Sequence, residues 1–161
     1  MKKLICNIGA LALGLLASIM AFVPMFDIKM TAGDKSEFAD QAFSIFKCQF
    51  ADADGFKDTF RVITMILAII AIAAFVILAI TVVMDFLGGK KSNMAGIKKL
   101  ACLVLVIVAI LIVIASIIFM AQNKESSSSF TVGLAISNWF AYLSVALGFA
   151  GAGILAFCAK K

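Results

Sequence analysis

The apolar residues of this chain are gathered in four long blocks, at about residues 4–26, 59–87, 98–121 and 131–157. A helix needs about 20 apolar residues to cross roughly 30 Å of hydrocarbon, and each block meets that length. Charged residues stand only near the ends of the blocks, as Asp85 does. The pattern predicts an all-α fold, in which residues 1–161 form one integral membrane domain, a four-helix transmembrane bundle.

The long connection between the first two blocks, residues 27–58, has a pattern that predicts an amphipathic helix. Asp34 and Glu37 stand at the spacing of a capping box. Apolar side chains then recur every four residues from Phe38 to Phe50, which places them on one helical face. That face either covers the end of the bundle or docks onto a partner. The candidate partner surface comprises Phe38, Phe43, Phe46, Cys48 and Phe50.

Small residues predict where the helices pack. Lipid tails are as apolar as leucine, so helices associate in a membrane by close approach of their backbones, which small side chains permit. In the fourth block, spacings of four and three place small residues on one stripe. The first block has a small residue at every fourth position on a face that can meet the fourth helix. The predicted packing residues are Ala10, Gly14, Ser18, Ser137, Ala141, Ser144, Gly148 and Gly151.

Two further features of the apolar blocks carry predictions. The third block is nearly all Ile, Val and Leu, with Ser116 as its one internal polar residue, which favours a lipid-facing helix. In the fourth block, Trp139 and Tyr142 are expected about three turns into the span, deeper than an interfacial aromatic belt lies.

The charged residues are distributed by topology. The two ends and the connection between the second and third blocks hold eight lysines and one aspartate, whereas the other two connections hold six basic and eight acidic residues. Short basic loops stay in the cytoplasm. Both termini and the middle loop are therefore expected inside, with residues 27–58 outside. This distribution accounts for the net charge of +5 without a nucleic-acid partner.

Composition narrows the function. The chain is 64% hydrophobic, and the expected spans hold no internal charge of the kind that ion-coupled transporters and proton relays use. The absence of histidine removes the imidazole base and the usual metal ligands, and no phosphate loop or nucleophile elbow is present. We expect no enzyme activity, no cofactor and no metal site.

Two questions stay open at the level of sequence. Cys6, Cys102 and Cys158 fall near the expected cytoplasmic ends of spans, whereas Cys48 falls outside and is either free, buried or paired to another chain. The first block has the basic start of a signal peptide. Its apolar run continues past the one candidate cleavage site, before Phe22, which favours a retained helix.

The plan of the chain resembles that of claudin-type tetraspan proteins. The similarity lies in the four spans, the long first and short second outer loops, and the glycine-rich ending from Gly148 to Cys158. Arg61 at the start of the second span is similar too, and residues 45–48 echo part of the first-loop motif, without its tryptophan and with one cysteine in place of two. The thirteen lysines against one arginine also resemble the composition of small four-helix membrane proteins of bacteria.

These observations predict a non-enzymatic structural or assembly subunit of the plasma or inner membrane. Its partners would be the lipid bilayer together with copies of itself or other membrane protein subunits. The alternative is an oligomeric channel or holin-like pore. Its polar lining would come from Ser116, Ser137, Asn138 and Ser144.

Overall fold

Four long helices form the body of the molecule in a computed structural model that describes residues 2–38, 44–46, 59–87, 94–126 and 129–159. All four are long and apolar enough to cross a membrane. At 1.5 Å per residue, α2 and α3 are about 42 to 44 Å long, which exceeds one hydrocarbon thickness. The helices are α1 (Lys2–Met20), α2 (Thr59–Phe86), α3 (Met94–Gln122) and α4 (Trp139–Cys158).

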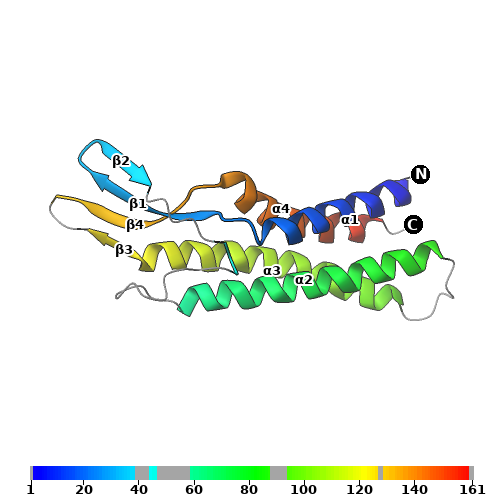
Figure 1. Cartoon of the computed structure of the whole chain (residues 1–161). Coiled ribbons are helices and arrows are strands. Elements are labelled where there is room, and N and C mark those ends of the chain that lie inside the picture. The colour runs from blue at the N-terminus through cyan, green and yellow to red at the C-terminus, as the bar shows by residue number, and fades with distance from the viewer. Residues whose placement is uncertain (1, 39–43, 47–58, 88–93, 127–128, 160–161) are drawn as a thin grey trace.

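The helices pack in the order α1, α4, α3, α2. The α1–α4, α4–α3 and α3–α2 interfaces are extensive, whereas α1 and α2 touch over a short stretch. The chain termini lie at one end of the bundle (Figure 1). The third helix packs between α2 and α4, and nine of its residues are buried. Its remaining faces expose large apolar side chains such as Leu103, Ile110 and Ile117, so its expected contact with lipid stays a prediction for those faces.

Glycines set the distance between the packed helices. A methyl group built on Gly148 of α4 would lie 2.8 Å from Cβ of Ala17 on α1. One built on Gly153, on another side of α4, would lie 2.7 Å from the Cys102 carbonyl oxygen of α3. At Gly151 the nearest atom is the flexible end of the Leu13 side chain, at 2.9 Å. The α4 backbone therefore approaches two neighbouring helices at once.

The small face expected on α1 is divided between two neighbours. Gly14 lies against the ring of Phe75 on α2. The Ser18 hydroxyl donates to the Gly14 carbonyl oxygen within α1, at 2.8 Å. The contact with Gly148 of α4 is made instead by Leu13 and Ala17.

The fourth helix begins later than its apolar block. Residues Thr131–Ile136 form strand β4, and α4 starts at Trp139. Asn138 is the N-cap: its Oδ1 accepts a hydrogen bond from the Ala141 backbone N–H at 3.1 Å. Ser137 therefore lies outside the helix. Trp139 is the first residue of α4 and Tyr142 lies in its first turn, so the expected position about three turns into the helix was wrong.

A four-stranded antiparallel sheet extends beyond the bundle at the end opposite the termini (Figure 1). Its order is β2-β1-β4-β3, so the two strands between α1 and α2 lie beside the two strands between α3 and α4. A backbone hydrogen bond links the two central strands near the bundle: the Ser137 N–H donates to the Met25 carbonyl oxygen at 3.0 Å. The other strands are β1 (Phe26–Ala32), β2 (Lys35–Phe38) and β3 (Lys124–Ser126).

The sheet replaces the start of the predicted amphipathic helix. Asp34 lies in a two-residue turn and residues Lys35–Phe38 form β2, paired with β1. Gly33 has φ of +58°, a conformation that glycine adopts readily and that tight hairpins require. Residues 44–46 are not helical either, and Ile45 is buried. Phe43, Cys48 and Phe50 lie outside the described residues.

The glycine contacts predict graded damage. Replacing Gly148 or Gly153 with alanine should lower the free energy of unfolding by roughly 1 to 3 kcal/mol, because the new methyl group meets Ala17 or the α3 backbone. Gly151→Ala should cost less, because the Leu13 side chain can rotate away. The measurement is reversible unfolding in mixed detergent micelles.

Ile110→Leu is the matched control, because Ile110 is 54% exposed on α3. Equal losses from Gly153→Ala and Ile110→Leu would show that the α3–α4 approach is not a point of close packing.

Candidate functional site

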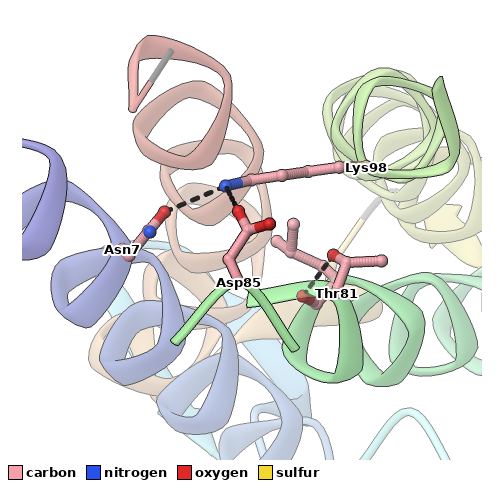
Figure 2. Close-up of polar contacts among 5 residues, drawn as sticks. Asn7, Thr81, Asp85 and Lys98 are labelled. Atoms are coloured by element: carbon pink, nitrogen blue, oxygen red, sulfur yellow. Dashed lines mark hydrogen bonds and ion pairs between the residues drawn. The ribbon is translucent and has the colours of Figure 1, made fainter. Parts of the chain in front are cut away.

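A polar cluster joins three helices at the end of the bundle that holds the termini. Lys98 of α3 reaches across to α1 and α2 (Figure 2). Its Nζ lies 3.1 Å from Oδ1 of Asn7, to which it donates a hydrogen bond, and 3.5 Å from Oδ2 of Asp85. The side chains of Lys98 and Asp85 are 14% and 38% exposed, and Asn7 is buried. We call these three residues the inner cluster.

The inner cluster ties α1 to the α2–α3 pair. Helices α1 and α2 touch little, with Gly14 against Phe75 as the contact described above. The Lys98 ammonium group of α3 adds to this small interface by contacting a residue of each helix. Asp85, the partner of Lys98 on α2, lies one turn after Thr81. The Thr81 hydroxyl donates a hydrogen bond to the Leu78 carbonyl oxygen of the same helix, at 2.7 Å (Figure 2). The chemistry of the cluster is that of a charged hydrogen-bonded tie between helices.

Sequence reasoning missed this cluster. Lys98 and Asp85 were treated as charges that set topology, and nothing near Asn7 marks it as a partner for Lys98, 91 positions away. The available signal was an amide inside an otherwise apolar first block. Such a group needs a hydrogen-bond partner from another helix.

At the other end of the bundle, aromatic rings join the sheet to α3 and α4. Phe26, the first residue of β1, meets Phe119 and Tyr142 edge-on, with ring centroids 6.3 and 6.0 Å away. Tyr142 also meets Trp139, at 6.1 Å. Ser116 is fully buried with its hydroxyl near the Tyr142 phenol, but its Oγ makes no hydrogen bond of standard geometry among the described residues. This junction fixes the root of the sheet.

The two faces of the sheet differ in chemistry, because successive residues of a strand point to opposite faces. On one face, Phe26 and Ile28 of β1 lie opposite Ile136 and Leu134 of β4. Further from the bundle, Met30 is opposite Val132 on this same face, and Met30 is 51% exposed. We call this the apolar face. The row through Met30 ends in a carboxylate on each edge strand, Glu125 and Glu37.

The other face, which we call the polar face, carries hydroxyl groups and amines. One row across the four strands consists of hydroxyl side chains only. The adjacent row on this face has two lysines separated by Gly133 and ends in Phe38, over whose ring the Lys29 ammonium lies at 5.9 Å. The hydroxyl row is Ser126, Thr131, Thr31 and Ser36, and the lysine row is Lys124, Gly133, Lys29 and Phe38.

The residues proposed from sequence are separated by the fold. Of the candidate pore lining, Ser116 is buried between helices, Ser137 is exposed ahead of α4, Asn138 caps α4 and Ser144 is half-buried. Of the candidate partner surface, Phe38 is 49% exposed on the sheet. Phe46 stacks on Phe22, with ring centroids 4.6 Å apart, and so covers part of the bundle end.

The predicted packing residues differ in their surroundings. Ala10, Ala141 and Gly148 are buried, Gly151 lies against Leu13 of α1, and Ser144 is half-buried. Gly14 packs against α2 instead of α4, Ser18 bonds within α1, and Ser137 lies outside the helix. Within the described residues, no group of three or more His, Cys, Asp or Glu side chains is placed to hold a metal ion.

The inner cluster predicts unequal effects of its members on stability. Lys98→Met leaves the buried Asn7 amide oxygen without its donor and should cost about 1 to 3 kcal/mol. Asp85→Asn should cost less than about 1 kcal/mol, because this carboxylate is partly exposed and its ion pair is screened. Unfolding in micelles measures both. Lys99→Met, at the exposed neighbouring position, should have no effect. Equal losses from Asp85→Asn and Lys98→Met would assign the tie to the ion pair, which both variants remove.

Two buried hydroxyl groups predict opposite responses to removal. Ser116→Ala should leave stability unchanged or raise it by roughly 1 kcal/mol, because it removes a hydroxyl that is desolvated without a partner. Thr81→Val removes a hydroxyl that donates to Leu78 and should lower stability by about 0.5 to 1.5 kcal/mol. Thermal unfolding in detergent compares the two. A destabilised Ser116→Ala protein would show that this hydroxyl has a partner.

Comparison with known proteins adds no relative from which a function can be carried over. No protein-family model matches this sequence, and no curated protein matches it. The likeness to claudins therefore stays a prediction from the plan of the chain, and function is argued from the described residues.

Proposed function

We propose that this chain is a non-enzymatic structural or assembly subunit of a membrane, which holds an interaction platform outside the lipid. The observation that carries the proposal is the sheet. Its central strands run directly into the packed helices α1 and α4 and rest on the Phe26 aromatic junction. A sheet so anchored holds its outward surfaces in fixed positions.

The apolar face supplies the surface for association. Met30 is half-exposed at a position where a soluble sheet would carry a polar side chain, and Val132 and Ile28 adjoin it. Exposed apolar surface rimmed by charge is typical of protein interaction sites. The strand edges fit this role less well. The edge strands β2 and β3 are short and carry lysine and glutamate, the features by which proteins prevent edge pairing.

The charges around this surface favour a different subunit over a second copy. Glu37 and Glu125 flank Met30 and Val132 on the two sides. Stacking two copies face to face would gather four carboxylates against only two lysines, Lys35 of each copy, around one apolar centre, and this excess of negative charge is unfavourable. A partner subunit with an apolar centre and basic rim would neutralise them. Self-association through other surfaces stays within the proposal.

The proposed orientation places the sheet on the extracytoplasmic side and both termini in the cytoplasm. It is supported by the excess of lysine at the termini and in the middle loop. The sheet and the termini lie at opposite ends of the bundle, as this orientation needs (Figure 1).

Thiol labelling tests the orientation. In a Cys48→Ser background, Ser36→Cys places an exposed thiol on β2. An impermeant maleimide should label it in intact cells, whereas the native exposed Cys158 should react only after the membrane is opened. Labelling of Cys158 alone in intact cells would reverse the orientation.

Native size tests the assembly. Protein extracted from its membrane in mild detergent should run as a species larger than the monomer. Met30→Glu, which places a charge on the apolar face, should shift it toward the monomer, whereas Ser36→Glu on the opposite face should not. Mass photometry or light scattering reads the mass. A monomeric wild-type protein would refute the assembly role, and purified protein that makes liposomes permeable to solutes would support the pore instead.

A further inference from the structure

We propose that the polar face of the sheet binds a linear anionic glycan, a sugar chain that carries carboxylate or phosphate groups. The proposal rests on the outward orientation in the proposed function, since such polymers lie outside the membrane. It concerns a different surface from the apolar face that serves assembly.

The first argument is charge. Lys29 and Lys124 are the charged side chains of the outer rows of this face, whereas Glu37 and Glu125 belong to the apolar face. Among the described strand residues, the acidic residue on the polar face is Asp27, at the root of the sheet. It is 7% exposed, and its Oδ1 accepts the Ile28 backbone N–H at 2.7 Å. The polar face is thus cationic where it is exposed.

The second argument is spacing. Neighbouring strands lie about 4.8 Å apart, so the hydroxyl row offers one hydroxyl group at each step across the sheet. Each step is close to the length of one sugar in an extended chain. Lys124 and Lys29 stand two strands apart, about 9 to 10 Å, which is close to a disaccharide. A glycan lying across the strands would meet a hydroxyl at each sugar and an amine at every second sugar.

The third argument is access. Gly133 stands between the two lysines, so no side chain rises between their amines. Ser126 Oγ and Thr131 Oγ1 lie 2.9 Å apart, which orients these two hydroxyl groups along the row. Phe38 closes the lysine row with a 49% exposed ring, on which the C–H side of a sugar can lie. The Lys29 ammonium above that ring is held in place while its N–H groups remain available to an acidic group.

The test uses the full chain in nanodiscs of zwitterionic lipid, with an octameric polyuronate as the probe and isothermal titration as the measurement. The wild-type protein should bind it, more weakly as salt is raised, because exposed charges are screened. Lys29→Gln combined with Lys124→Gln should weaken binding at least tenfold. Gly133→Val, which places a side chain between the lysines without changing charge, should weaken it as well.

Lys35→Gln is the matched control, since Lys35 lies on the same sheet but on the apolar face, and it should bind like the wild type. Thermal unfolding of each variant confirms that the sheet is intact. The proposal is overturned if Lys35→Gln loses as much affinity as the lysine pair, if a neutral maltooctaose binds equally, or if no polyuronate binding occurs. It is also overturned if the protein prefers nanodiscs or vesicles of anionic lipid and the polyuronate does not compete. Each of these outcomes leaves the native-size test of assembly unaffected.

Discussion

The close approach of α4 to both α1 and α3 is the contact on which the other helices depend. Gly148 and Gly153 are five residues apart, which places them about 140° apart around the helix, so each faces a different neighbour. Apolar helices in lipid gain little from the hydrophobic effect. Their association depends on dispersion contacts, which weaken steeply with distance. Without these glycines, two interfaces would separate together, and α2, which joins the bundle through α3, would lose its position.

The packing of α1 against α4 also places β1 beside β4 at the centre of the sheet. Strands β1 and β4 pair along their length and lead into the ends of α1 and α4 that face away from the termini. In hydrocarbon, a sheet with open edges would leave backbone N–H and C=O groups unpaired, at a cost of several kcal/mol each. The strands accordingly lie beyond the ends of the packed helices, although β4 belongs by composition to the fourth apolar block, and the aromatic junction around Phe26 joins the sheet to the helices.

The apolar blocks were enough to predict four long helices, because an uninterrupted apolar segment of this length has few other stable conformations. They did not show the sheet. Phe38 and Phe46 share a four-residue period, and this outweighed a plainer signal: apolar Phe26, Ile28 and Met30 alternate with polar residues up to a Gly-Asp turn. Strand β4 was hidden because Thr131–Ile136 is uncharged and merges with the following helix. The Asn7–Lys98 contact was out of reach for another reason. It joins residues 91 positions apart, and no local pattern records such a pairing.

The pairing of α1 with α4 also sets an order of events during synthesis. These are the first and last helices of the bundle, and about 120 residues separate the end of one from the start of the other. At 5 to 20 residues per second, the ribosome needs roughly 6 to 24 s to make that segment. For this interval Ala17 and Leu13 have no partner, and β1 has no β4 to pair with. Until α4 is made, the first helix therefore lacks its most extensive packing partner. A chain that stops before α4 would keep that apolar face of α1 uncovered, and β1 would keep an unpaired edge.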